Sequence, residues 1–173
     1  MKYKVMIVED QTMPRELFEL RVQASERFEL ALSIDNAALA DVYCLRFPVD
    51  LILMDVITRD GENGLDAAAR IKRAFPQIKI IIVTSMPECS YLKRAKEIGV
   101  ESFWYKEEQR ESLLDVMERT MNGESVYPGA SPELTLGMAS SYQFTERELD
   151  ILREITSGDT NQEIADRLNM SVA

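Results

Sequence analysis

The stretch Leu51-Ile52-Leu53-Met54-Asp55 decides the fold of this chain. Four consecutive apolar residues without helical periodicity predict a strand that is covered on both faces, as in the centre of a parallel sheet. The run stops at a single aspartate. An acidic side chain directly after such a strand lies at the carboxyl edge of the sheet, where α/β folds of this kind bind their ligands.

Four further β-prone runs lie along the chain, and a helical pattern follows each of the five. The other runs are Val5–Val8, Phe28–Ile34, Ile78–Val83 and Ser102–Tyr105. Helices are expected at residues 14–27, at 37–47, from 65 to before Pro76, at 90–98 and at 109–121. This β-α alternation predicts a flavodoxin-like, doubly wound, five-stranded parallel sheet.

Chemically active side chains follow four of the predicted strands. In chain order they are Glu9, Asp10, Asp55, Thr84, Ser85 and Lys106. Because the carboxyl ends of parallel strands meet at one edge, the three carboxylates are expected to lie together. Their mutual repulsion and desolvation would be costly without a bound cation. The pattern therefore predicts a site for a hard divalent ion, Mg²⁺, with oxygen ligands.

Phosphoryl transfer onto a carboxylate fits this set of residues. Asp55 is the nucleophile candidate, since an aspartate can attack phosphorus while a metal offsets the developing charge. Asp10 is expected to bind Mg²⁺ directly and Glu9 through water. The backbone carbonyl of Ile57 would add another oxygen ligand.

Two further side chains are expected to act on the attached phosphoryl group. The ammonium of Lys106 would pair with it as a point charge, and the hydroxyl of Thr84 would donate a hydrogen bond to it. Ser85, next to Thr84, is included in the same predicted phosphate-binding set.

The five strand ends together resemble those of a two-component response regulator receiver domain, over residues 1–121. The resemblance implies Mg²⁺-dependent transfer of phosphate from a histidine kinase to Asp55. It also implies that Thr84 then moves toward the phosphate and that the aromatic residue three before Lys106 rotates. That residue is Phe103. Such a domain is a phosphoacceptor with at most slow autophosphatase activity, not an enzyme.

The loop after Asp55 departs from that family. Receivers usually place a proline four residues after the aspartate and a glycine eight after it. Here Arg59 takes the first position, and Gly64 falls one residue late. The loop has gained a residue within 60–63, so its shape over the metal site is expected to differ from that of the family. Arg59 is expected to be a solvated loop residue.

Residues 144–173 resemble the start of the LuxR-type helix-turn-helix that follows receivers of the NarL (FixJ) subfamily. Capping boxes at Thr145–Glu148 and Thr160–Glu163 predict two short helices. Glycine, proline and serine break residues 122–143, a predicted linker with a short helical or packed element near 134–138. The fold class is thus a receiver sheet, a linker and a partial all-α helix-turn-helix.

In that family the recognition helix would begin near Ser171, so no DNA-reading residue is expected to be present before it. The sequence as printed is therefore expected to bind DNA poorly. Promoter DNA and a phosphorylation-dependent homodimer are the partners implied for the full-length protein, with a cognate histidine kinase.

The composition limits the remaining options. A formal net charge of −10 and a pI near 4.6 argue against a surface that coats nucleic acid. Cys44 and Cys89 are too few for a disulfide framework or a metal site and are expected to be reduced thiols. The absence of a long apolar run and of a signal-peptide pattern predicts a cytoplasmic protein without a membrane partner.

Two other functions compete with a phosphorylation-controlled transcription factor. An aspartyl phosphatase on a similar sheet usually carries a second aspartate two residues after the nucleophile, where this chain has Ile57. A truncated receiver that binds and inhibits a full-length partner without binding DNA is the other alternative.

Overall fold

The computed structural model describes residues 2–86, 88–106, 111–129, 135–136, 139–140, 148, 151, 160–168 and 170. The chain divides into two compact units, Met1–Ser131 and Pro132–Ala173. Among the described helices, none combines the length and the apolar character that crossing a bilayer requires.

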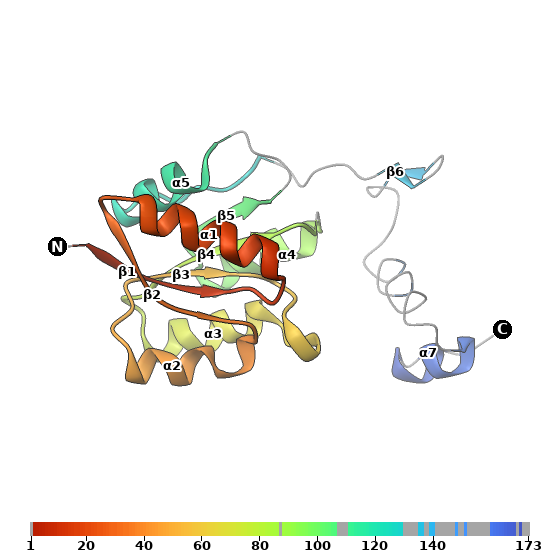
Figure 1. The fold of residues 1–173 in the computed structure, drawn as a ribbon. Helices are drawn as coiled ribbons and strands as arrows, with labels where there is room; N and C mark the ends of the chain where they lie inside the picture. The colour runs from red at the N-terminus through yellow and green to blue at the C-terminus, as the bar shows by residue number, and fades with distance from the viewer. Residues whose placement is uncertain are drawn as a thin grey trace. The chain divides into compact units, whose positions relative to one another are not determined.

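A five-stranded parallel sheet forms the centre of the first unit (Figure 1). Its strands are β1 (Tyr3–Val8), β2 (Phe28–Ile34), β3 (Leu51–Met54), β4 (Lys79–Thr84) and β5 (Ser102–Tyr105). They lie in the order β2-β1-β3-β4-β5, and every neighbouring pair is parallel. The predicted doubly wound sheet is confirmed. The strand order reverses between β1 and β3, so the crevice at their carboxyl ends is where this fold binds ligands.

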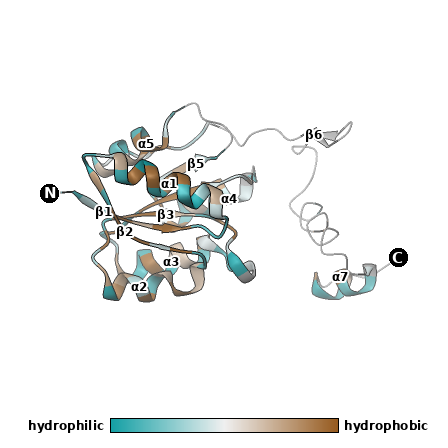
Figure 2. Cartoon of the chain, viewed as in Figure 1, coloured by the Kyte–Doolittle hydropathy of each residue, from teal (hydrophilic) through white to brown (hydrophobic). Residues whose placement is uncertain are grey.

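Helices cover both faces of the sheet. Helices α1 (Thr12–Ala24) and α5 (Leu113–Met121) cover one face, and α2 (Ala40–Arg46) and α3 (Gly64–Ala74) cover the other (Figure 1). Helix α4 (Cys89–Ile98) adds side chains to the core on the α2 and α3 side. The 3₁₀ turn η1 (Ala37–Leu39) runs directly into α2, and η2 (Arg59–Gly61) lies in the loop between β3 and α3. Figure 2 shows the apolar character of the central strand β3, which is buried along its whole length.

Several helix ends differ from the sequence-based expectation. Helix α1 begins at Thr12 and ends at Ala24, so it is shifted toward the N-terminus relative to 14–27. Helix α5 begins at Leu113 rather than at 109, because the Ser112 side chain accepts a hydrogen bond from the Asp115 amide and caps the helix. Residues 107–110 lie outside the described residues.

The second unit contains a short antiparallel pair, β6 (Thr135–Leu136) and β7 (Ala139–Ser140), and helix α7 (Asn161–Arg167). The element expected near 134–138 is thus a β pair. Thr160 and Glu163 form the predicted capping box of α7. The capping box at Thr145 and the helix expected near Ser171 lie outside the described residues, apart from the helical Glu148. The linker bounds 122–143 stay a prediction.

Candidate functional site

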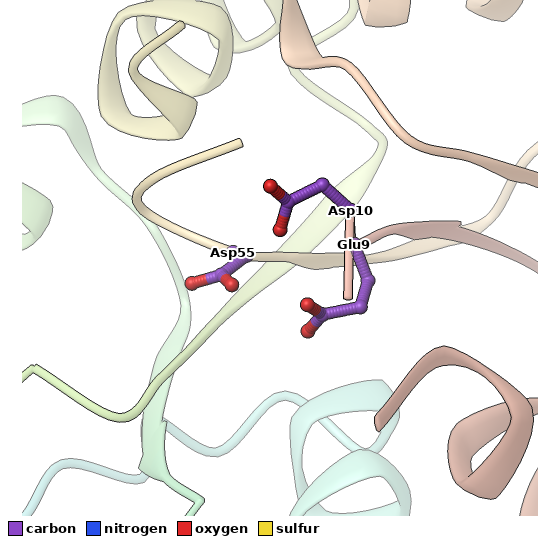
Figure 3. A group of neighbouring side chains, drawn as sticks. All are labelled: Glu9, Asp10 and Asp55. Atoms are coloured by element: carbon purple, nitrogen blue, oxygen red, sulfur yellow. The ribbon is translucent and has the colours of Figure 1, made fainter. Parts of the chain in front are cut away.

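Three carboxylates lie together where β1 and β3 end. Glu9 and Asp10 directly follow β1, and Asp55 directly follows the neighbouring β3 (Figure 3). Each offers a carboxylate oxygen within 4.8 Å of those of the other two. The order of the strands produces this cluster, since β1 and β3 are adjacent in the sheet although about 45 residues separate their ends in the sequence.

The backbone fixes Asp55 in this position. Its amide donates to the Val8 carbonyl at 2.9 Å, and its Oδ1 accepts from the Val56 amide at 2.7 Å. Only 6% of the residue is exposed. The second carboxylate oxygen, Oδ2, faces Lys106 Nζ at 2.7 Å.

Lys106 bridges two of the three carboxylates. Its Nζ lies 2.5 Å from Glu9 Oε2 as well as 2.7 Å from Asp55 Oδ2. Its backbone amide donates to the Thr84 carbonyl at 2.9 Å, which extends the pairing of β4 with β5 by one residue. One ammonium therefore compensates part of the negative charge that three carboxylates bring together.

Glu9 and Asp10 have different environments. Glu9 is 1% exposed, and its Oε1 accepts from the Gln11 amide at 3.1 Å while its Oε2 binds Lys106. Asp10 is only partly buried and has no hydrogen bond or ion pair with other described side chains. Of the acid pair, Asp10 thus has the carboxylate that is free to bind a cation, and the metal-binding roles of the two residues stay a prediction.

The protonation behaviour of the cluster reflects burial. Desolvation raises the pKa of Asp55 above its ordinary value, and the charge of Asp10 adds to this, while Lys106 and the Val56 amide oppose it. Desolvation also raises the pKa of Glu9, with Lys106 opposing. Burial by itself would lower the pKa of Lys106, but the two carboxylates together raise it. The carboxylates are destabilised as anions, so the donor set fits a divalent cation.

The other predicted residues are only partly brought to the cluster. Thr84 is buried, and its Oγ1 accepts from the Met86 amide at 3.1 Å. Ser85 is exposed. Phe103 lies in the hydrophobic core, with its ring centroid 5.1 Å from that of Tyr105. The side chain of Ile57 is 41% exposed.

Sequence reasoning missed the role of Thr58, which orders the longer loop. Its Oγ1 accepts from the Ala37 amide and donates to the Glu62 carbonyl, both at 3.0 Å, and the residue is 2% exposed. Ile57 and Asn63 form a β-bridge that closes the loop. The sequence shows only a threonine among turn formers, and nothing in that pattern indicates its burial or its distant partner Ala37.

Gly64 has a steric role that its late position concealed. A Cβ atom built there would lie 1.8 Å from the Asp55 carbonyl oxygen. The Gly64 amide also donates to the Val56 carbonyl at 2.7 Å. Although Gly64 falls one residue late, it packs directly on the backbone of Asp55. Arg59 is largely exposed, as expected, and pairs with Asp35 at 2.6 Å.

Comparison with known proteins identifies the family. Residues 5–118 match the model of the response regulator receiver domain. The chain belongs to the response regulator family. Residues 142–173 match the LuxR family of bacterial regulatory proteins. The response regulator protein VraR of Staphylococcus epidermidis is 32% identical over 180 residues, which cover 99% of this chain and 84% of the relative. VraR of Staphylococcus aureus shows the same identity and coverage.

Solved structures agree with this assignment. A DNA-binding response regulator of the LuxR family from Staphylococcus aureus is 27% identical, with a TM-score of 0.61, over 69% of this chain and 96% of that one. A LuxR-family response regulator from Aurantimonas has a TM-score of 0.67 at 19% identity, over 73% and 89% of the two chains, which supports the fold alone. A receiver and a LuxR-type unit in one chain make this response regulator a two-component transcription regulator.

Proposed function

We propose that Asp55 accepts a phosphoryl group from a histidine kinase in a Mg²⁺-dependent reaction, and that this controls dimerisation and DNA binding. The observation that carries the proposal is the placement of the buried Asp55 carboxylate. It lies beside the partly exposed Asp10 and 2.7 Å from the ammonium of Lys106. A nucleophile, a cation-binding carboxylate and a positive charge thus meet at the crevice between β1 and β3.

The transfer requires little covalent chemistry from the protein. An Asp55 oxygen attacks phosphorus while the bond to the leaving imidazole nitrogen breaks, and that nitrogen keeps the electron pair. Asp10, Asp55 and the predicted Ile57 carbonyl would hold Mg²⁺, with Glu9 acting through water, and the ion would offset the negative charge of the transferring phosphoryl group. Binding this ion also relieves the repulsion among the desolvated carboxylates.

The remaining predicted residues act after transfer. Lys106 pairs with the phosphoryl group, and its ion pair with Asp55 gives way to that contact. The Thr84 hydroxyl, whose oxygen now accepts from the Met86 amide, turns to donate to the phosphate, with Ser85 beside it. Phe103 then rotates and carries the change away from the site. The chain acts as a phosphoacceptor with at most slow autophosphatase activity. A cytoplasmic location stays a prediction.

The two family matches support the proposed partners. A cognate histidine kinase would dock at the Asp55 crevice. The full-length protein would form a homodimer when phosphorylated, and its LuxR-type unit would then bind promoter DNA. RcsB, a protein with a similar fold (TM-score 0.68), has been solved as two dimers bound to two DNAs. That arrangement is a property of RcsB and serves here as a precedent.

The decisive experiment uses acetyl phosphate with Mg²⁺ and intact-mass spectrometry. The chain should gain the mass of one phosphoryl group, and Asp55→Asn should abolish the gain. Asp66→Asn, which changes an exposed carboxylate on α3, is the matched control and should be phosphorylated normally. Undiminished phosphorylation of Asp55→Asn would exclude the proposed acceptor.

A further inference from the structure

The chain reverses direction directly after α5. Gly123 has φ +96°, a left-handed conformation that favours glycine, and its amide donates to the Thr120 carbonyl at 3.0 Å. The Glu124 amide donates to the Arg119 carbonyl at 3.0 Å, while the Arg119 Nε donates to the Glu124 carboxylate at 2.8 Å. The residues that follow are thereby directed back toward β5.

The returning segment, residues 124–127, covers the outer edge of the sheet. Strand β5 is an edge strand, so its outer backbone groups lack a neighbouring strand. The Phe103 amide donates to the Val126 carbonyl at 2.8 Å, and the Val126 amide donates to Ser102 Oγ at 3.1 Å. The Tyr127 hydroxyl donates to the Val100 carbonyl at 2.7 Å. We call residues 124–127 the β5 clasp.

A buried polar pair anchors the clasp to α5. Ser102 Oγ, which accepts from the clasp, also lies 2.7 Å from Thr120 Oγ1, and Ser102 and Thr120 are both fully buried. Thr120 Oγ1 donates to the Val116 carbonyl at 2.6 Å. The clasp thus packs against both β5 and α5.

Tyr127 fixes the ring of Phe103. The two ring centroids are 6.3 Å apart, and Phe103 lies 5.1 Å from Tyr105 within the same core cluster. The Lys96 ammonium lies 5.0 Å from the centroid of Tyr127, a cation-π contact that holds this ring from α4. Because Phe103 is only 2% exposed, it cannot change rotamer unless one of its aromatic neighbours moves.

We propose that the β5 clasp is the element through which the receiver signals to the second unit, with Tyr127 as the residue that reports the position of Phe103. The clasp is covalently continuous with the chain that leads into the second unit, which begins at Pro132. A rearrangement of Phe103 removes a packing partner of Tyr127 and loosens the segment. This inference rests on the proposed phosphorylation of Asp55.

Linkage makes the coupling reciprocal. If occupation of the Asp55 site releases the clasp, a substitution that favours the released clasp must also tighten binding at the Asp55 site. The gain in affinity equals the factor by which the substitution shifts the clasp equilibrium toward release. Tyr127→Phe removes the hydrogen bond to Val100 and keeps the ring. Since such a bond contributes about 0.5–1.5 kcal/mol, the affinity for beryllofluoride with Mg²⁺ should rise about twofold to tenfold.

Two readouts on the full chain separate this inference from the proposed function. Trp104 is the only tryptophan and lines the same groove as Lys106, so its fluorescence reports beryllofluoride and Mg²⁺ at the Asp55 site. Amide hydrogen exchange of residues 124–127 reports the clasp. We expect both to change on titration with the same midpoint. A Trp104 response without faster exchange in the clasp would overturn the clasp inference and leave the proposed function standing. The absence of a response in both readouts would overturn both the clasp inference and the proposed function.

Matched variants test the reciprocal effect. Tyr127→Ala should tighten beryllofluoride binding at least as much as Tyr127→Phe. If the alanine variant does not fold, Tyr127→Phe, which retains the ring, still tests the inference. Tyr43→Ala is the control, because Tyr43 is also a partly buried aromatic residue at the margin of the same core cluster but packs against Phe47 instead. Unchanged affinity in Tyr127→Phe, or an equal gain in Tyr43→Ala, would contradict the coupling.

Discussion

Lys106 Nζ lies 2.7 Å from Asp55 Oδ2, and both side chains are less than a tenth exposed. The ammonium thus occupies one side of the carboxylate that is proposed to carry the phosphoryl group. Lys106 also pairs with Glu9, so its ammonium can leave the Asp55 carboxylate for the phosphoryl group and still keep the contact with Glu9. In the unphosphorylated chain it limits the electrostatic cost of three neighbouring carboxylates.

Replacing Lys106 should destabilise the receiver in a way that Mg²⁺ reverses. Lys106→Met leaves the buried Glu9 and Asp55 without their cation, which should cost about 3–5 kcal/mol in urea unfolding. Added Mg²⁺ should restore more stability to this variant than to the wild type, because the ion supplies the missing charge. Lys72→Met breaks a comparable pair with Glu101 away from the site and should show no such rescue.

Gly64→Ala should be severely destabilising because its Cβ would collide with the Asp55 carbonyl. Relief of a 1.8 Å contact requires the backbone to shift, at a cost of about 1–3 kcal/mol or more, and should weaken Mg²⁺ binding together with stability. Gly129→Ala meets no atom within 4 Å and should be nearly neutral in thermal unfolding and Mg²⁺ titration. Similar behaviour of the two variants would contradict the close approach.

Thr58→Val should loosen the loop over the site. Valine keeps the volume but leaves the buried Ala37 amide without its acceptor, which should cost about 1–3 kcal/mol. Thr58→Ser retains the hydroxyl and should restore most of the lost stability. Chemical denaturation of the three proteins measures the effect. If Thr58→Val matched the wild type, the loop would not depend on this bridge.

Cys44 should be a slow nucleophile at neutral pH. Burial, with the charge of Asp41, raises the pKa of its thiol to about 11, and the thiolate is the reactive form. In a Cys89→Ser background, alkylation of the folded chain should rise about tenfold per pH unit up to that value. Because the folded state disfavours the thiolate, the neutral thiol adds to the free energy of unfolding. This contribution is present below pH 9 and is lost as the pH rises toward 11. Rapid alkylation at pH 7 in the folded state would contradict this environment.

The strands and the acid pair were predictable because they depend on local patterns. Continuous apolar runs such as Leu51–Met54 identify buried strands, and strand ends then locate Glu9, Asp10 and Asp55. Helix ends were less predictable, since the cap at Ser112 competes with a longer helical pattern. The loop could not be predicted at all, because Thr58 acts on Ala37, which lies 21 residues earlier in the chain.

The sequence by itself determined the parallel sheet, the residues at its strand ends and the family to which they belong. Only the tertiary structure decided that Lys106 pairs with Glu9 and Asp55, that Gly64 packs on the Asp55 carbonyl and that Tyr127 contacts Phe103. The physical reason is that composition and periodicity report burial along one strand or helix. Contacts between distant segments depend instead on the order of strands and on how each connecting loop closes.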